Sequence, residues 1–204
     1  MSLWAIIPVK PLRRGKSRLA GVLSDDERTL LNYTMLGNTL KAVSAVAEID
    51  QVLVVSRDTS ALALAREHGA RTVQEEGSPE LNTALRRATL VAKAYGARGV
   101  MILPADLPLI NPKDIREFVG YSGNPPEIII APDRRGEGTN ALLVSPAGLI
   151  DYCFGKDSFK CHSQRAQKKA ARLVVCKIEG LSLDLDLPED LEIFKHYETL
   201  QINS

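Results

Sequence analysis

The chain has 204 residues, 45% of them hydrophobic, and its 26 basic side chains nearly cancel its 25 acidic ones, which leaves a formal net charge of +1. Apolar residues in this proportion are enough for a proper core, so the composition excludes a disordered chain. The length fits one large domain or two small ones, and we expect a single domain over residues 1–204. The balanced charge excludes the strong overall field that would favour nucleic acid or a membrane surface as a partner.

The apolar segments and the cysteines indicate in which cellular compartment the protein is expected. Every apolar segment is too short to span a bilayer, and the first residues lack the long apolar region of a secretory signal, so we expect a soluble, cytoplasmic protein. The three cysteines are Cys153, Cys161 and Cys176, an odd number without a C-x-x-C pair. This pattern argues against a disulfide framework and a structural zinc site, and we expect reduced thiols.

The first predicted strand, residues 3–9, leads directly into a basic loop. Five cations lie within nine residues there: Lys10, Arg13, Arg14, Lys16 and Arg18. One explanation is a solvated surface loop. The other is phosphate binding, because ligands of an open α/β sheet lie at the carboxyl ends of its strands, where a polyphosphate would need this charge.

Helices and strands alternate through the next part of the chain. Ser24 and Glu27 match a capping box, which predicts a helix to about residue 46. There follow a buried strand at residues 51–56, a helix at 59–68, an edge strand at 71–74, and a helix at about 79–95 with Ser78 as its N-cap. Asn82, near the start of this last helix, is either a surface residue or a donor to a nucleotide.

The apolar run at residues 100–109 predicts a strand buried on both faces. Its first polar group is the carboxylate of Asp106, set between Pro104 and Pro108, which block any helical continuation. A ligand, or a metal that holds one, is expected at this point of an open α/β sheet. For the aspartate alone, a turn residue that caps its own backbone is the commoner explanation.

The next segments surround a polar loop at residues 132–140. They are predicted as a helix from Asn111 to about residue 119, strands at 127–131 and 141–144, a helix at about 159–170 and a strand at 173–178. Gly155 and Ser158 stand near the start of the helix at 159–170, which suits an anion as readily as a plain cap. His162, one turn further on, lies within reach of the same site, although a structural role is the commoner one for a lone histidine.

Residues 181–187 alternate strictly between leucine and polar side chains. In a strand this pattern puts Asp184 and Asp186 on one face, with their Cα atoms about 6.5 to 7 Å apart, so both carboxylates can converge on a hard cation. Capping of the last helix, residues 188–197, is an alternative for Asp186, but it leaves Asp184 unexplained.

Six pieces of the chain, in this order, resemble the 2-phospho-L-lactate guanylyltransferase family of deazaflavin coenzyme biosynthesis, which includes relatives that use phosphoenolpyruvate. The pieces are VK at 9–10 with KSRL at 16–19, LNTAL at 81–85, ADLP at 105–108, DRRGEGT at 133–139, FGKDS at 154–158 with His162, and DLDLPEDL at 184–191. The resemblance implies an α/β fold, the Rossmann-like three-layer nucleotidyltransferase fold with a mostly parallel central sheet. It also implies a homodimer.

The resemblance also implies a site. Its metal ligands for Mg²⁺ would be Asp106, Asp184 and Asp186; its nucleotide-binding residues Lys10, Lys16, Arg18 and Asn82; and its acceptor-binding residues Thr139, Gly155 and Ser158. Asp106, Lys16 and Lys10 would act in catalysis. Which of Arg13, Arg14, Arg134 and Arg135 reaches the phosphates stays open.

The reaction that the resemblance implies joins GTP to a phosphorylated small acid. The phosphate of 2-phospho-L-lactate attacks the α-phosphorus of GTP, and pyrophosphate leaves. Three alternatives remain: the same reaction on phosphoenolpyruvate, nucleotidyl transfer to a sugar phosphate, and a non-catalytic nucleotide-binding regulator that kept the fold.

Overall fold

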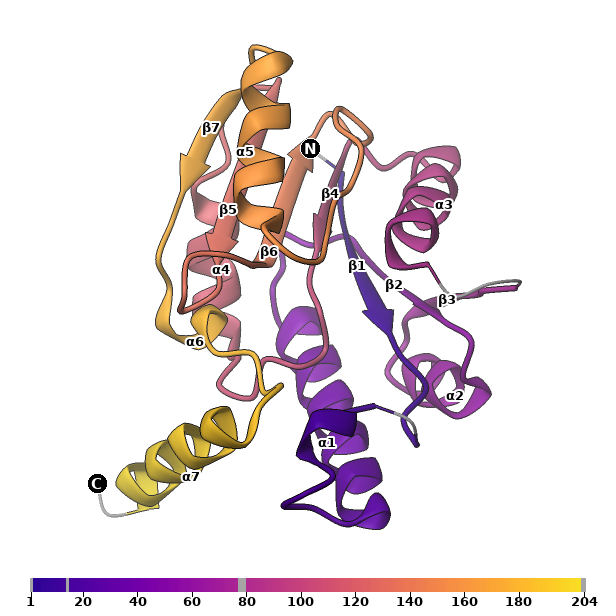
Figure 1. Ribbon diagram of the computed structural model, residues 1–204. Helices are drawn as coiled ribbons and strands as arrows, with labels where there is room; N and C mark the ends of the chain where they lie inside the picture. Colours follow the sequence, from indigo (N-terminus) through magenta and orange to yellow (C-terminus); the bar gives the residue numbers. More distant parts are fainter. Residues whose placement is uncertain (1, 14, 77–79, 203–204) are drawn as a thin grey trace.

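A seven-stranded mixed sheet forms the centre of the molecule in the computed structural model, which describes residues 2–13, 15–76 and 80–202 (Figure 1). The strands are β1 Leu3–Val9, β2 Gln51–Ser56, β3 Arg71–Gln74, β4 Gly99–Ile102, β5 Glu127–Pro132, β6 Thr139–Ser145 and β7 Arg172–Val175. Their order across the sheet is β3-β2-β1-β4-β6-β5-β7. Neighbouring strands run parallel except where β6 pairs with β4 and β5, which confirms the mostly parallel sheet.

Helices cover both faces of this sheet, and the fold therefore has the three layers that were predicted. The helices are α1 Asp25–Ser44, α2 Thr59–Glu67, α3 Leu81–Ala94, α4 Pro112–Gly120, α5 Ser158–Lys168, α6 Glu179–Ser182 and α7 Pro188–Ile202, with a 3₁₀ turn η1 at Ser17–Leu19. Along β1, Ala5 and Ile7 pack toward α1, α2, α4 and α6, whereas Trp4 and Ile6 pack toward α3 and α5. This alternation follows from the period of two of a strand buried on both faces. None of the helices in the described residues is both long and apolar enough to cross a membrane.

Local signals set several helix boundaries as predicted. Ser24 and Glu27 form the capping box of α1, with the Ser24 side chain accepting from the Glu27 N–H and the Glu27 carboxylate accepting from the Ser24 N–H. Asn111 caps α4, and Pro112 takes its first position. Gly69, with φ of +77°, lets the chain turn after His68 at the end of α2.

Other boundaries differ from the predictions. Strand β4 ends at Ile102, well before residue 109, because the prolines that follow cannot continue the ladder. Glu80 caps α3 through the N–H groups of Asn82 and Thr83, while Ser78 and Pro79 lie outside the described residues.

The prediction of a strand at residues 181–187 was wrong. Its first residues belong to α6, and the rest is extended but joins no sheet in the described structure. Leu183 and Leu185 are buried, while Asp184 and Asp186 are partly exposed. The alternation therefore predicted correctly which side chains point into the core and which point outward. The N–H of Leu185 donates to the carbonyl oxygen of Asp106 at 3.0 Å. The segment is therefore held by the loop after β4 and not by a strand.

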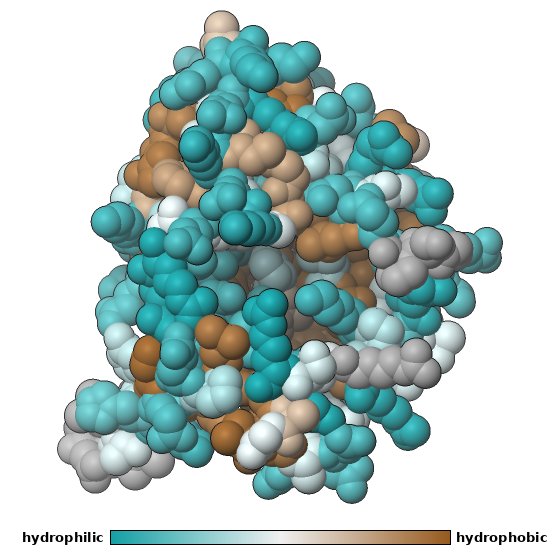
Figure 2. Space-filling model, in the orientation of Figure 1, coloured by the Kyte–Doolittle hydropathy of each residue, from teal (hydrophilic) through white to brown (hydrophobic). Residues whose placement is uncertain are grey.

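Helix α7 leaves the body of the molecule at the lower left of Figure 1. Its first turn is anchored by Leu191, which packs with Leu19, Met35 and Leu185 in a small apolar cluster below the sheet. Hydrophilic side chains dominate the face drawn in Figure 2, with apolar ones in small groups among them. The anchored first turn matters for the site, because it follows directly after Asp186.

Candidate active site

The basic loop and the Asp106 loop meet at the carboxyl edge of the sheet. Strands β1 and β4 are parallel neighbours, so the loops that follow them leave the same edge, which points downward in Figure 1. Lys16 Nζ lies 3.4 Å from Asp106 Oδ2 and 3.2 Å from Asp186 Oδ1, and the lysine side chain is only 6% exposed. Arg18, largely exposed, lies 3.8 Å from the other oxygen of Asp186. We call Lys16, Arg18, Asp106, Asp184 and Asp186 the carboxylate–lysine cluster.

Asp184 completes this cluster through its charge. Burial and the negative charge of Asp106, with a further contribution from Asp186, raise the pKa of Asp184 to about 6 from an ordinary value of 3.8. Asp106 and Asp186 are therefore close enough to Asp184 to disfavour its ionisation. A divalent cation would remove that penalty.

The donor types of the cluster fit Mg²⁺, which prefers carboxylate and phosphate oxygens and retains several waters. Over residues 2–13, 15–76 and 80–202, no group of three or more acidic, histidine or cysteine side chains is already arranged to hold a metal ion. In this structure the ammonium of Lys16 stands between two of the carboxylates instead. Asp106, Asp184 and Asp186 would hold the metal once Lys16 turned toward a phosphate.

The start of β6 connects the Asp184 segment to the predicted acceptor-binding residues Thr139, Gly155 and Ser158, which we call the acceptor side. Asn140 is buried, and its side-chain amide donates to the carbonyl oxygens of Leu181 and Ser182 at 3.0 and 3.1 Å. Asn140 was not among the residues predicted for the site. Its neighbour Thr139 is one of the predicted acceptor-binding residues. Two adjacent residues of β6 therefore connect the Asp184 segment with the predicted acceptor-binding residues.

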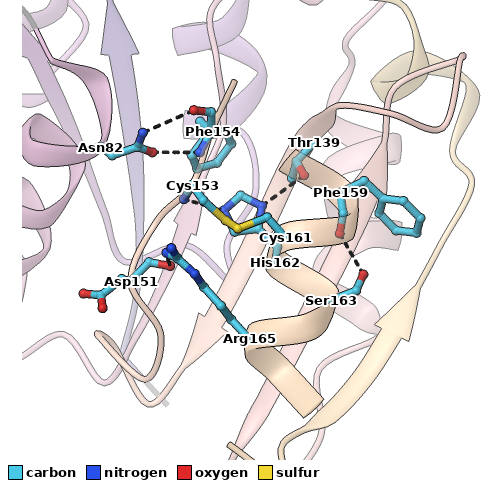
Figure 3. The surroundings of a disulfide bond; sticks show 10 residues. All are labelled: Asn82, Thr139, Asp151, Cys153, Phe154, Phe159, Cys161, His162, Ser163 and Arg165. Atoms are coloured by element: carbon cyan, nitrogen blue, oxygen red, sulfur yellow. Dashed lines mark hydrogen bonds between the residues drawn. A yellow bond between two sulfur atoms is a disulfide. The ribbon is translucent and has the colours of Figure 1, made fainter. Parts of the chain in front are cut away.

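On the acceptor side, Thr139 and His162 form a buried pair (Figure 3). His162 Nε2 accepts from the N–H of Cys153 at 3.1 Å, which leaves the proton on Nδ1 for the contact to Thr139 Oγ1, also 3.1 Å. Burial, aided by the nearby charge of Arg165, lowers the pKa of His162 to about 4. The ring is therefore neutral near pH 7 and positions Thr139, as expected for a structural histidine.

The other predicted acceptor residues lie where α5 begins. Ser158, 1% exposed, is the first residue of α5, and its N–H donates to the carbonyl oxygen of Gly155 at 3.2 Å. The N–H of Phe159 donates to the carbonyl oxygen of Glu137, in the loop before Thr139. The structure thus brings Thr139, Gly155 and Ser158 to one region.

The Asn82 amide holds the segment before α5. Its oxygen accepts from the N–H of Phe154 at 2.7 Å, and its nitrogen donates to the carbonyl oxygen of the same residue at 3.2 Å (Figure 3). Both functions of the amide are thus engaged within the chain. A contact between Asn82 and a nucleotide stays a prediction.

A disulfide bond closes the same segment onto α5, and the expectation of three reduced thiols was therefore wrong. Cys153 and Cys161 are joined, with 6.4 Å between their Cα atoms (Figure 3). Cys176 is buried and free, and burial raises the pKa of its thiol to about 11. An odd number of cysteines excludes a complete pairing but not one pair, and a spacing of eight residues is no recognised motif.

The remaining cations divide into two groups. Lys10 is exposed directly after β1, and Arg13 lines a hollow of about 510 Å³ between the basic loop and α2. Arg134 and Arg135 instead pair with Glu189 and Asp190 at the start of α7. Arg14 lies outside the described residues.

The family follows from a match over nearly the whole chain. Residues 3–202 match the family model described as "Guanylyl transferase CofC like". The chain belongs to this family. It is 42% identical over 191 residues to a phosphoenolpyruvate guanylyltransferase of Rubrobacter xylanophilus, with 94% of this chain and 92% of that protein covered. It is 37% identical over 193 residues to a 2-phospho-L-lactate guanylyltransferase of Methanocaldococcus jannaschii, with 94% and 82% covered. The family resemblance drawn from the sequence is thereby confirmed.

Solved structures agree on the fold. A nucleotidyl transferase from Methanothermobacter superposes with a TM-score of 0.71 at 17% identity, covering 98% of this chain and 99% of its own. A 4-diphosphocytidyl-2C-methyl-D-erythritol synthase of Anaerococcus prevotii gives a TM-score of 0.65 at 12% identity, with 97% and 96% covered. This chain therefore has the nucleotidyltransferase fold.

Proposed function

We propose that this protein transfers the guanylyl group of GTP to a phosphorylated three-carbon acid, with phosphoenolpyruvate as its first acceptor and 2-phospho-L-lactate as its second. The observation that carries the proposal is the carboxylate–lysine cluster at the carboxyl edge of the sheet, where Lys16 bridges Asp106 and Asp186. The order of the acceptors rests on the Rubrobacter relative, whose name specifies phosphoenolpyruvate and whose identity exceeds that of the Methanocaldococcus relative.

In the proposed reaction, a phosphate oxygen of the acceptor forms a bond to the α-phosphorus of GTP. The bond from that phosphorus to the oxygen bridging the β-phosphate breaks, and pyrophosphate leaves with the electron pair. Like unit charges 4 Å apart repel by about 4 kcal/mol at an effective dielectric constant near 20, so bringing two polyanions together is the main difficulty. Lys16 and Arg18 offset that repulsion at the triphosphate. When bound, Mg²⁺ supplies further neutralisation of the phosphates and of the departing pyrophosphate.

No general base is required, because the attacking phosphate oxygen is already ionised near neutral pH. His162 is the histidine nearest to the proposed acceptor residues, and it is unsuited to proton transfer. Both of its ring nitrogens are engaged, and burial lowers its pKa to about 4. Its role is to keep the hydroxyl of Thr139 in place for the acceptor.

The acceptor would lie between Thr139 and the start of α5. The hydroxyl of Ser158 and the positive end of the α5 dipole together suit a phosphate or a carboxylate. The two candidate acceptors carry the same charged groups and differ by two hydrogens. Their discrimination therefore depends on shape at the three-carbon unit and not on charge.

The test is an assay of the purified protein with GTP and Mg²⁺ in which each acceptor is offered separately and the product mass is followed. We expect pyrophosphate release with phosphoenolpyruvate, a product joining guanosine monophosphate to the acceptor, and slower release with 2-phospho-L-lactate. Release with sugar phosphates alone would overturn the acceptor class. Binding of GTP without turnover on any acceptor would favour a regulator.

A further inference from the structure

One buried carboxylate in the run at residues 184–191 has no part in the proposed reaction. Asp190 is 2% exposed, although it lies in the first turn of α7, close to the surface. Its Oδ2 accepts from the N–H of Leu187 at 2.7 Å and from the N–H of Asp186 at 3.1 Å. One oxygen of Asp190 therefore fixes the main chain at a proposed metal ligand.

The other oxygen of Asp190 binds the loop after β5. Arg134 donates to Asp190 Oδ1 from Nη2 at 2.8 Å and from Nε at 3.3 Å, and Arg135 lies 3.5 Å from the same oxygen. Burial alone would raise the pKa of Asp190, but the hydrogen bonds from Arg134 and from the main chain outweigh it and lower the pKa. Asp190 is therefore a charged anchor near neutral pH.

Arg134 also holds the other end of the segment that contains the proposed metal ligands Asp184 and Asp186. Its main-chain N–H donates to the carbonyl oxygen of Ser182 at 2.8 Å, two residues before Asp184. The segment with Asp184 and Asp186 is thus held at both ends. The main chain of Arg134 binds it at Ser182, and Asp190 binds it at Asp186. The side chain of Arg134 in turn binds Asp190. The same loop continues into Thr139 on the acceptor side.

From these contacts we infer that Asp190 is a positioning residue, which acts through Arg134 and the main chain of Asp186 to set Asp184 and Asp186 for metal binding. The inference rests on the proposed function, because it assigns the work of Asp190 to the proposed metal site. The alternative role is an ordinary cap of α7, in which Asp190 serves only the helix. A plain cap needs neither the buried contact with Arg134 nor the bond to the N–H of Asp186.

The test compares Asp190→Ala and Asp190→Asn with Arg134→Gln, and uses Glu189→Gln as the matched control. Glu189 pairs with the same arginines but is 62% exposed on its side chain. Three measurements are made on each variant: the Mn²⁺ dissociation constant by electron paramagnetic resonance, hydrogen exchange of residues 182–190, and the thermal midpoint. Mn²⁺ serves as the probe for the magnesium site, and Asp106→Asn defines the signal of a lost ligand.

We expect Asp190→Ala to weaken Mn²⁺ binding by about 10- to 100-fold, the usual cost of removing a group that orients a metal ligand. Asp190→Asn and Arg134→Gln should fall between that variant and the wild type, since each keeps part of the network. Hydrogen exchange at residues 182–190 should accelerate in the same order. Glu189→Gln should match the wild type in both measurements.

Three results would overturn the inference. Asp190 variants that lose thermal stability but bind Mn²⁺ like the wild type would reduce the residue to a helix cap. An equal loss of Mn²⁺ affinity in Glu189→Gln would mean that the affinity depends on neutralising the charge of Arg134 and Arg135 and not on Asp190 itself. Wild-type protein that binds no Mn²⁺ would overturn the proposed metal site and this inference together, and only this last result touches the proposed function. Should Asp190→Ala fail to fold, Asp190→Asn and Arg134→Gln carry the same comparison.

Discussion

The two parts of the candidate site are built from different interactions. The carboxylate–lysine cluster is held by ionic contacts of 3.2 to 3.8 Å that join partly exposed carboxylates to the nearly buried Lys16 and the exposed Arg18. The acceptor side is held by a neutral histidine, a side-chain amide bonded to the main chain, and a disulfide. The first part holds three carboxylates against two cations, so a bound cation would complete its charge balance. In the second part, Asn82 and His162 already have hydrogen-bond partners within the chain. Changes in the cluster should therefore affect chemistry, and changes on the acceptor side should affect affinity for one substrate.

The largest expected effect is the loss of a proposed metal ligand. Asp106→Asn or Asp184→Asn should lower turnover by more than about 100-fold, because even residues that only orient such ligands are worth 10- to 100-fold. Both variants should stay folded, and the thermal midpoint of Asp184→Asn should not fall, because this change removes the carboxylate whose ionisation is disfavoured by burial and by the charge of Asp106. Pyrophosphate release at saturating Mg²⁺ is the measurement. A rate near that of the wild type in either variant would contradict the assignment.

Removal of the central cation should have the next largest effect. Lys16→Met should raise the dissociation constant for GTP by about 10- to 100-fold, in line with 1.5 to 3 kcal/mol for a charge-assisted hydrogen bond. Titration calorimetry with GTP checks it. The matched control is Lys195→Met, which removes a cation paired only with exposed Glu192 on α7 and should leave the dissociation constant unchanged.

The pH dependence of Asp184 tests the crowding of negative charge in the cluster. Its pKa in the folded protein is raised to about 6 from 3.8, so the folded state keeps a proton that the unfolded state has lost between about pH 4 and pH 6. The free energy of unfolding should therefore fall as pH rises through this window, and this contribution should be flat above it. Thermal midpoints in chelator, compared with those of Asp184→Asn, measure the effect. A constant difference between the two proteins across the window would speak against the shift.

The same proton competes with the metal. Below about pH 6, each unit of falling pH should raise the Mn²⁺ dissociation constant up to about tenfold, because the ligand must be ionised to bind. The acceptor side should show no such pH dependence above pH 5, because the pKa of His162 is near 4.

The smallest expected effect is on the acceptor side, where the disulfide can be removed without touching any charge. Cys153→Ser with Cys161→Ser should raise the KM for the acceptor about two- to tenfold, the worth of one loosened hydrogen bond, and leave the KM for GTP unchanged. The free energy of unfolding should fall by roughly 2 to 3 kcal/mol for a loop of this size. Dithiothreitol should reproduce both changes in the wild type and have no effect on the double variant. An equal change in both KM values would contradict the separation of the two parts.

Features encoded by neighbouring residues were predictable. The cap at Ser24 and the start of α4 at Asn111 both depend on groups a few residues apart, and both agree with the predictions from the sequence. The meeting of Lys16 with Asp106 was also predictable, because the strand pattern put the loops after β1 and β4 at one edge.

Features encoded by distant residues were not. The alternation at residues 181–187 reports which side chains are buried, but apolar contacts bury leucines without a sheet ladder, so the strand was wrong. The partner of Asp190 lies on a loop 56 residues earlier. The pairing of Cys153 with Cys161 depends on how α5 folds back over the preceding segment. Only the three-dimensional arrangement reveals these contacts.

The amide of Asn82 has a consequence for how the acceptor segment can vary. It exchanges one N–H···O bond in each direction with Phe154, which is the exchange that a residue of an antiparallel strand makes with its opposite partner. A side chain on α3 thus imitates a strand for the chain at residues 151–157. That segment takes its position from side chains of α3 and α5 and not from the seven-stranded ladder. Insertions or deletions there can accordingly change the surroundings of the proposed acceptor-binding residues while the sheet keeps its register.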